Sequence, residues 1–254
     1  MTQHLQKWHG AGNDFLVAIG DGIGEGWSAS DARAICHRHF GLGADGLLLG
    51  DTANGFLTMT LFNADGSIAE MSGNGIRCLV AAYLRETGRD DSFVEVSTLA
   101  GTRRVSMQMN GDSGTGAVAM GPVTMLPSIP GALAVASVGN PHVVVMDVPE
   151  WSEHEREELA LQLADLVGGA NVEFLTVVDK QTIQIRIVER GVGWTMACGT
   201  GSCASAAVAH AVGYTQRDVT VRNPGGDLAV SFDEQGAVLS GPVVFVGDVE
   251  WSQG

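Results

Sequence analysis

The same glycine-rich turn occurs twice in this chain, each time directly before a short apolar segment with helical character. The first copy is Ser72-Gly73-Asn74-Gly75-Ile76-Arg77-Cys78, and the second is Cys198-Gly199-Thr200-Gly201-Ser202-Cys203. The first residues of the two copies are 126 positions apart (198 − 72 = 126). A repeat at a fixed spacing is typical of a duplicated structural unit, so the spacing can be tested elsewhere in the chain.

The same spacing recurs in other short motifs, in the same order. Gly43-Ala44-Asp45 aligns with Gly169-Ala170-Asn171 (171 − 45 = 126), Asn63 aligns with Glu189, and Asn13 aligns with Asn140 one residue out of register. We therefore expect two homologous halves, 1–121 and 122–254, with a boundary near Gly121-Pro122 and a last strand able to return to the first half. Two halves of this size are each large enough for a small domain. They are expected to face each other across a cleft, which places residues 72 and 198 on opposite walls.

Hydrophobic periodicity predicts a strand-rich fold with a few helices. The clearest alternation is Thr182–Ile187, which puts three isoleucines on one face. Helices are expected from a cap at Ser30 to Phe40, from Pro149 to Gly168-Gly169, and after each of the two glycine-rich turns. The expected strands include Gly55–Asn63, Phe93–Thr98, Thr102–Met109, Val172–Asp179, Thr182–Glu189 and Asp227–Phe232.

Composition narrows the classes of function. The formal net charge is −15 and the only lysines are Lys7 and Lys180, so nucleic-acid and anionic-membrane binding are not expected. The N-terminal residues lack the apolar run of a signal peptide. The four cysteines do not form a disulfide framework or a zinc-like spacing, which favours a reducing cytoplasm and no metal site.

The two turns suggest proton-transfer chemistry. Unpaired backbone N–H groups and the helix dipole at such a turn can hold a carboxylate, and a thiol there is expected to have its pKa lowered toward neutrality. Two facing turns can bind an amino acid between two acid/base groups and invert its α-carbon. Pyridoxal phosphate would require Lys7 or Lys180, and neither lies in a glycine-rich phosphate-binding context. The simpler interpretation is a tight turn with a buried, unreactive cysteine.

Further motifs are found along most of the chain, and together they resemble the diaminopimelate epimerase family. They are His9-Gly10-Ala11-Gly12-Asn13-Asp14-Phe15, Phe62-Asn63-Ala64-Asp65-Gly66-Ser67, Gly73-Asn74-Gly75-Ile76-Arg77-Cys78, Gly139-Asn140-Pro141-His142, Glu189-Arg190-Gly191 and Ala197-Cys198-Gly199-Thr200-Gly201. The resemblance implies an α+β fold of two pseudo-symmetric domains. Each is a β-barrel-like sheet wrapped around a central helix, and the substrate site lies in the interdomain cleft.

The resemblance also implies an activity and a set of site residues. The implied enzyme is a cytoplasmic, homodimeric isomerase without cofactor or metal, which converts LL-2,6-diaminopimelate to the meso form for lysine and peptidoglycan synthesis. Cys198 and Ser72 would occupy the catalytic positions, and His142 and Glu189 would tune them. Arg190 would pair with the distal carboxylate, while Asn and Glu side chains grip the distal ammonium. The implied substrate-binding residues are Asn13, Asn63, Gly73, Asn74, Asn140, Asn171, Glu189, Arg190, Gly199 and Thr200.

The chain departs from the family pattern at Ser72, where the family has cysteine. A hydroxyl is a far weaker acid than a thiol, so two-base symmetry is in question. Ser72 is then a proton relay in a natural variant, an engineered substitution, or the mark of a one-base paralogue. Trp194 and Gly46 are smaller departures that bear on substrate preference. The alternative functions are a racemase of another amino acid, a one-base lyase of this fold, and a catalytically silent amino-acid-binding protein.

Overall fold

The computed structural model describes residues 2–252 and divides them into two compact units. One unit contains the chain up to Val118 together with the chain from Gly241 onward, and the other is Ala119–Ser240. The sequence places the boundary at Gly121-Pro122, whereas the contacts divide between Val118 and Ala119. The two units are described separately below.

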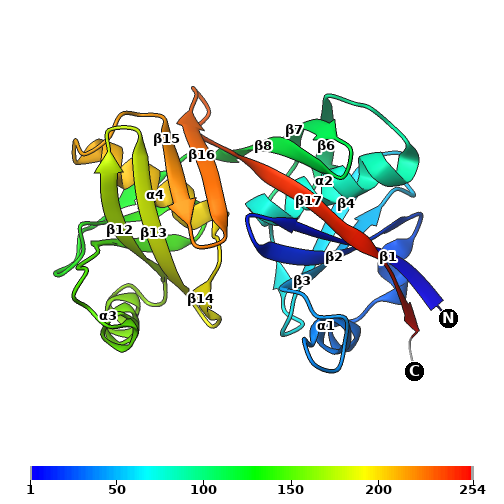
Figure 1. Cartoon of the computed structure of the whole chain (residues 1–254), viewed down its shortest axis with the longest axis horizontal. Coiled ribbons are helices and arrows are strands. Elements are labelled where there is room, and N and C mark those ends of the chain that lie inside the picture. The colour runs from blue at the N-terminus through cyan, green and yellow to red at the C-terminus, as the bar shows by residue number, and fades with distance from the viewer. Residues whose placement is uncertain (1, 253–254) are drawn as a thin grey trace. The chain divides into compact units, whose positions relative to one another are not determined.

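The first unit begins with two antiparallel strands, continues to a central helix and ends with two long strands (Figure 1). Its elements are β1 (Thr2–Gly10), β2 (Asn13–Gly20), a 3-10 helix (Ile23–Gly26), α1 (Ala29–Cys36), β3 (Gly46–Asp51), β4 (Leu57–Asn63), β5 (Ile68–Ala69), α2 (Gly73–Thr87), β6 (Phe93–Ser97), β7 (Arg103–Asn110) and β8 (Ser113–Gly121).

The second unit repeats this order of elements. It contains β9 (Thr124–Leu126), β10 (Ala134–Ser137), β11 (Pro141–Met146), α3 (Glu153–Leu166), β12 (Asn171–Asp179), β13 (Thr182–Glu189), β14 (Gly193–Thr195), α4 (Gly199–Ala211), β15 (Val219–Asn223), β16 (Gly226–Phe232) and β17 (Ala237–Ser252). The last strand, β17, supplies residues to both units.

Strand pairing confirms the two pseudo-symmetric halves. In the first unit β2 pairs with β3 in parallel, β3 with β4 antiparallel, β4 with β6 in parallel, and β6 with β7 antiparallel. The second unit has the same series: β11–β12 parallel, β12–β13 antiparallel, β13–β15 parallel and β15–β16 antiparallel. A series of alternating directions is too specific to arise from short glycine motifs alone, so the duplication extends over whole units.

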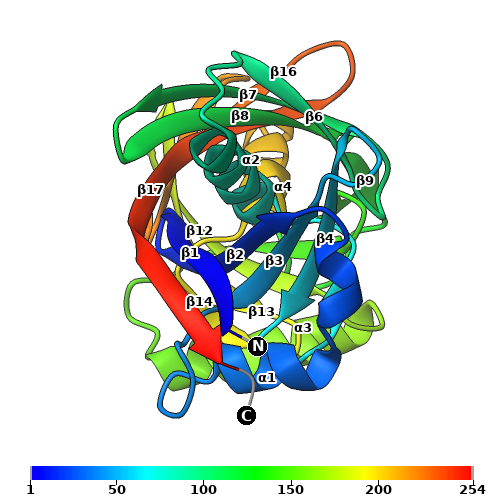
Figure 2. The same ribbon diagram turned by 90° about the vertical axis from the view of Figure 1, so that its right-hand side faces the viewer.

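Each unit wraps its strands around one helix, as expected of this α+β fold. Helix α2 packs against β1, β2, β3, β4 and β7, and Figure 2 shows it surrounded by strands of the first unit. Helix α4 packs against β10, β11, β12, β13, β15 and β16. The sequence of α4 is apolar and small on nearly all sides, which suits a helix buried around its whole circumference. The N-termini of these two helices are the glycine-rich turns.

The outer helices α1 and α3 each cover one hydrophobic cluster. Ile35 of α1 packs in a cluster with Leu16 and Leu47, and Leu163 of α3 packs in a cluster with Val143 and Phe174. The expected starts of both helices were wrong. Ser28 caps α1 in a capping box with Asp31, and Ser152 caps α3 with Glu155, because a serine followed three residues later by a carboxylate satisfies two free backbone donors.

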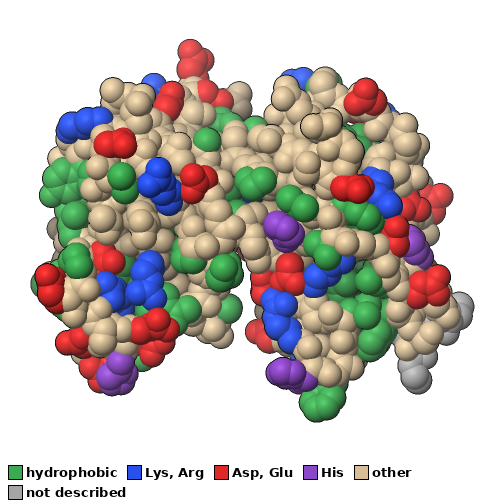
Figure 3. Space-filling model, in the orientation of Figure 1, with side chains coloured by type: hydrophobic (Ala, Val, Ile, Leu, Met, Phe, Trp, Pro, Cys, Tyr) green, Lys and Arg blue, Asp and Glu red, His purple; other side chains and the backbone are tan. Residues whose placement is uncertain are grey.

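The surface carries charges of both signs in small groups. The sequence has 29 Asp and Glu against 14 Lys and Arg, and Figure 3 shows side chains of both signs scattered over the face that it draws. Within residues 2–252, no helix is long and apolar enough to cross a membrane.

Candidate active site

Ser72 is the N-cap of α2 in the first unit. Its Oγ accepts a hydrogen bond from the backbone N–H of Gly75 at 3.0 Å, and Ser72 is itself half-buried. Gly73 and Asn74 occupy the first two helical positions, so their backbone N–H groups lie at the helix N-terminus. The turn therefore presents a hydroxyl and backbone N–H groups at the positive end of a helix dipole, which suits an anion.

A chain of hydrogen bonds fixes the side chains behind this turn. Arg77, fully buried, donates to the Gly73 carbonyl oxygen at 2.9 Å and to Asn74 Oδ1 at 2.8 Å. Asn74 Nδ2 then lies 3.4 Å from Asn13 Oδ1, and Asn13 Nδ2 donates to Asp45 Oδ2 at 2.8 Å. Because a guanidinium can only donate and a carboxylate can only accept, both ends impose the same orientation on the two amides.

The Asp45 end of this chain is an ion network near the surface. Arg38 bonds Asp14 at 2.7 Å and Asp45 at 2.6 Å, and Lys7 lies 2.5 Å from Asp14. Burial alone would raise the pKa of Asp14, but the hydrogen bonds and charges of Arg38 and Lys7 prevail and lower it to about 2. The network thus keeps Asp14 ionised and keeps the Lys7 amine in an ion pair with it.

Asn63 lies at the end of β4 in the same unit. Its Nδ2 donates to Ser67 Oγ at 2.9 Å, and its backbone N–H bonds the Ser67 carbonyl oxygen, so it closes its own turn. This contact is the ordinary turn role of asparagine, and Asn63 makes it while half-buried.

Cys198 is the N-cap of α4 in the second unit and repeats the geometry of Ser72. Its sulfur accepts from the Gly201 N–H at 3.4 Å and lies 3.4 Å from Thr200 Oγ1. The thiol is only 8% exposed. Gly199 and Thr200 hold the first helical positions, so their backbone N–H groups lie at the helix N-terminus as those of Gly73 and Asn74 do.

The expectation that this thiol has a lowered pKa was wrong. Burial raises the pKa of Cys198 well above its usual value of 9.0, and the negative charges of Glu189 and Glu173 raise it further. The hydrogen bonds from Thr200 and Gly201 only partly oppose these effects. Cys198 is therefore a protonated thiol in the free protein, because the local helix terminus is outweighed by two carboxylates that other strands bring to it.

Glu189, at the end of β13, lies beside the thiol. Its Oε1 accepts from Thr195 Oγ1 at 2.6 Å, and it also accepts a hydrogen bond from Cys198. Burial raises the pKa of Glu189, and Glu173 raises it further, whereas Thr195, His142 and Cys198 lower it. The structure thus brings Glu189, His142 and Cys198 into one electrostatic group.

His142 and Asn140 lie next to each other at the start of β11. His142 Nε2 is 3.1 Å from Asn140 Oδ1, and His142 Nδ1 is 2.6 Å from Glu173 Oε1. The His142 and Glu173 side chains are both completely buried.

A hydrogen bond joins the Asn171 side chain to the backbone of Arg190. Asn171 Oδ1 accepts from the Arg190 N–H at 2.9 Å, while the Arg190 side chain is exposed and packs over Gly169. Trp194, one of the departures from the family pattern, donates from Nε1 to Glu157 Oε1 at 2.6 Å and stacks under Arg186. Trp194 therefore packs between β13 and α3.

The sequence analysis missed two acidic residues of this region, Asp45 and Glu173. Asp45 orients Asn13, and Glu173 contacts His142. Glu173 could have been found, because it interrupts the otherwise apolar run Val172–Leu175 at the centre of a strand. An acidic side chain in such a run is rarely tolerated unless it is paired.

The other cysteines are buried away from the caps. Burial raises the pKa of Cys36 and of Cys78 to about 12. Cys203 is fully buried on α4. Within residues 2–252, no group of three or more His, Cys, Asp or Glu side chains is arranged to hold a metal ion.

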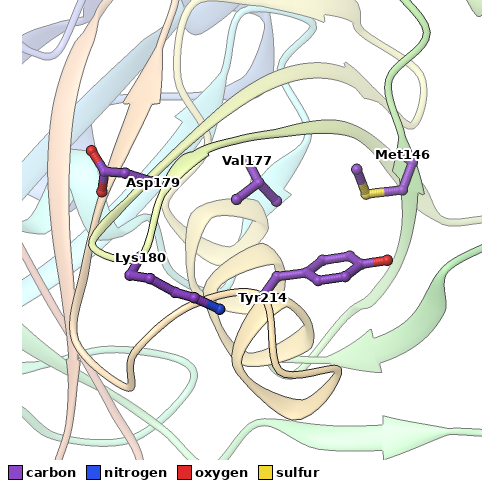
Figure 4. Close-up of a pocket in the computed structure, with 5 residues that line it drawn as sticks. All are labelled: Met146, Val177, Asp179, Lys180 and Tyr214. Atoms are coloured by element: carbon purple, nitrogen blue, oxygen red, sulfur yellow. The ribbon is translucent and has the colours of Figure 1, made fainter.

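A cavity of about 400 Å³ in the second unit lies apart from these residues. It is lined by Met146, Val177, Asp179, Lys180 and Tyr214, whose side chains are drawn in Figure 4. Lys180 Nζ donates to the Gly213 carbonyl oxygen at 3.1 Å. None of the expected site residues lines this cavity.

Solved structures share this fold. A protein described as a predicted epimerase from Pseudomonas aeruginosa aligns with a TM-score of 0.80 at 13% identity, over 99% of this chain and 100% of that chain. A hydroxyproline epimerase from Agrobacterium vitis aligns with a TM-score of 0.69 at 18% identity, over 98% of this chain and 92% of that chain. These two alignments show that the chain shares the fold of proteins described as epimerases.

Sequence relatives give the family. The diaminopimelate epimerase family model matches residues 5–126 and 134–246. A diaminopimelate epimerase from Xanthomonas campestris pv. campestris is 37% identical over 97% of this chain and 95% of its own length. One from Halothermothrix orenii is 35% identical over the full length of both. The chain belongs to the diaminopimelate epimerase family.

Proposed function

We propose that this protein epimerises LL-2,6-diaminopimelate to meso-diaminopimelate by proton transfer at the α-carbon, without a cofactor. The observation that carries the proposal is that Ser72 and Cys198 cap α2 and α4 with the same geometry, within a chain of this family. We further propose that the α-carboxylate of the substrate accepts from N–H groups at a capped helix N-terminus, which stabilise the negative charge that develops on deprotonation.

The polar residues of the second unit suit a substrate that is zwitterionic at both ends. Arg190 is exposed and can pair with a distal carboxylate, whereas Glu189 and Asn side chains other than that of Asn140 can hold an ammonium. Asn13 and Asn63 of the first unit complete the proposed binding set. Such polar contacts would select a diaminodicarboxylate over an amino acid with an apolar side chain.

Two different groups would carry the protons. Cys198 is protonated at rest, so it donates its S–H proton to one face of the α-carbon. On the other face the Ser72 hydroxyl relays: Oγ takes the α-proton while its own proton passes to solvent. Solvent then restores the Cys198 thiol, so protons balance over one turnover. A hydroxyl is a poor base, and we therefore expect slow turnover.

Incubation with LL-diaminopimelate in D₂O tests the proposal. We expect deuterium at the α-carbon of the meso product, and faster incorporation by the Ser72→Cys variant. Absence of α-deuterium from both stereoisomers with both proteins would overturn the proposed function. A parallel panel of other amino acids would reveal a racemase of different substrate preference.

Ser72 itself favours a second candidate, a protein that binds the amino acid without turning it over. Calorimetric binding of diaminopimelate by the wild-type protein, with no exchange in D₂O, would establish it. We also propose that the enzyme is a cytoplasmic homodimer serving lysine and peptidoglycan synthesis. Light scattering tests whether the protein is a dimer, and cell fractionation tests whether it is cytoplasmic.

A further inference from the structure

The Glu173 carboxylate is buried at the centre of β12, where an unpaired charge is costly. Its side chain is completely inaccessible to solvent, and its Oε1 lies 2.6 Å from His142 Nδ1. Within residues 2–252, its Oε2 has no hydrogen-bond partner. A buried carboxylate with one contact of this kind either loses its charge or faces a cation.

The contacts of His142 limit these states to two. An ionised Glu173 accepts from a protonated Nδ1, whereas a protonated Glu173 would donate to Nδ1 of a neutral ring. The other ring nitrogen, Nε2, lies 3.1 Å from Asn140 Oδ1, which is also an acceptor. Nε2 therefore carries a proton in both states, and the ring is an imidazolium in the state in which Glu173 is ionised.

We propose that Glu173 is a positioning residue that holds His142 as an imidazolium and, through it, fixes the Asn140 amide with Nδ2 directed to the substrate. An amide held in this way donates, and donors suit a carboxylate. If His142 were neutral with its proton on Nδ1, Nε2 would accept and Asn140 would turn to present its oxygen, which suits an ammonium. Glu173 thus sets which charged group Asn140 binds. The identity of that substrate rests on the function proposed above.

The groups around His142 are consistent with a charged pair. From β13, Glu189 faces the ring, and the positive charge of His142 lowers the pKa of Glu189. From α4 come the Cys198 thiol and the positive end of the helix dipole. On β10 the residue paired with His142 is Ala136, which carries no charge.

The packing of α4 shows how closely Glu173 approaches the Cys198 turn. A Cβ built at Gly201 would lie 2.6 Å from Glu173 Oε1. The carboxylate thus lies against the first turn of the helix, where the dipole favours its ionised form. The second glycine of the turn leaves room for this carboxylate.

The proposal can be tested in the free protein by ¹⁵N NMR of the histidine rings, with the His142 signals assigned by their loss in His142→Gln. We expect both nitrogens of His142 to be protonated at pH 7 in wild type, and a neutral ring in Glu173→Gln. Glu158→Gln is the matched control, because Glu158 pairs with His154 on the exposed face of α3 at 3.4 Å. The proposal would be overturned if the His142 ring were neutral in wild type at pH 7, or if its protonation in Glu173→Gln were the same as in wild type.

Steady-state kinetics provide a second readout. We expect Glu173→Gln to raise KM for diaminopimelate at least tenfold with kcat changed by less than threefold, while Glu173→Asp, which keeps the charge, recovers part of the loss. An equal KM in Glu173→Gln and Glu158→Gln contradicts the role assigned to Asn140. If neither wild type nor Ser72→Cys turns over diaminopimelate, the proposed function fails, and the NMR result still decides the state of His142. If Glu173→Gln does not fold, the protonation state of His142 in the wild-type protein decides the proposal by itself.

Discussion

Ser72 and Cys198 hold nearly the same backbone conformation at the N-caps of α2 and α4. Their torsion angles are φ −134°, ψ 127° and φ −123°, ψ 120°, and each side chain accepts from the N–H three residues later. The two positions therefore differ in chemistry and not in geometry. Exchanging the atom at one position should change reactivity without rebuilding the turn.

Replacing Ser72 with cysteine is expected to raise the epimerisation rate. A thiol titrates near pH 8.5, so it can serve as a base that a hydroxyl cannot, and a positioned base contributes about 10²- to 10⁴-fold. The measurement is the initial rate of α-deuterium incorporation into diaminopimelate. Ser72→Ala is the control and should be no faster than wild type. An unchanged rate in Ser72→Cys would mean that residue 72 does not take part in proton transfer.

The resting state of Cys198 can be measured by alkylation. Because burial and two carboxylates raise its pKa well above 9.0, we expect slow labelling by iodoacetamide at pH 7 and a rate that is still rising at pH 10. Tandem mass spectrometry separates Cys198 from Cys203. In Glu189→Gln the alkylation rate of Cys198 should begin to rise at a lower pH, because one negative charge is removed. The surface change Glu158→Gln should leave this pH unchanged. A rate that levels off below pH 8.5 would contradict the protonated thiol.

Ser72 and Cys198 also show how much of the site could be predicted from the sequence. The duplicated turns were predictable because glycine spacing and helix capping are local properties, and the strand Thr182–Glu189 matched its alternating pattern. The pKa of Cys198 was not predictable in this way. Glu189 and Glu173 come from β13 and β12, so their effect depends on tertiary packing that no local motif encodes.

Helix boundaries were missed for a different reason. Ser30 and Ser28 are both plausible caps, and the structure selects Ser28 because Asp31 completes a capping box with it. The same explanation applies to Ser152 and Glu155 of α3. The reciprocal carboxylate was visible in the sequence. A last strand able to return to the first half was also expected, whereas its register with β1 joins residues more than 200 positions apart and was not predicted.

The ion network at Asp14 predicts a stability that depends on acid pH. The pKa of Asp14 is lowered from 3.8 to about 2, so its ionised form stabilises the fold above pH 3.8, and this contribution is lost as the pH falls toward 2. The shift corresponds to about 2 kcal/mol, which screening at the partly exposed Arg38 reduces to about 1 kcal/mol. Asp14→Asn should therefore be less stable than wild type by about 1 kcal/mol at pH 6.

Urea unfolding followed by circular dichroism between pH 6 and pH 3 measures the Asp14 contribution. The difference between wild type and Asp14→Asn should narrow as the pH falls below 3.8. Asp218→Asn is a control, because the Asp218 side chain accepts from the backbone N–H of Phe232 and no cation pairs with it among the ion pairs of residues 2–252. A difference that stays constant over this range would show that the ionisation of Asp14 does not contribute.

Adding a methyl group at Gly201 should destabilise the protein more than adding one at Gly75, its counterpart in the first turn. At Gly201 the new Cβ meets Glu173 Oε1 at 2.6 Å, and that carboxylate is buried against His142 and cannot move aside. At Gly75 the nearest atom is Ser72 Cβ at 3.1 Å. Overpacking costs about 1–3 kcal/mol, whereas alanine gains up to about 1 kcal/mol in a helix.

We therefore expect Gly201→Ala to lower the free energy of unfolding by about 1–3 kcal/mol and Gly75→Ala to change it by less than about 1 kcal/mol. Chemical denaturation of the two variants provides the comparison. Because Glu173→Asp shortens the side chain, it should withdraw the carboxylate from residue 201, and the double variant Gly201→Ala, Glu173→Asp should be more stable than the sum of its single changes predicts. Strict additivity would mean that the cost at Gly201 arises elsewhere than at Glu173.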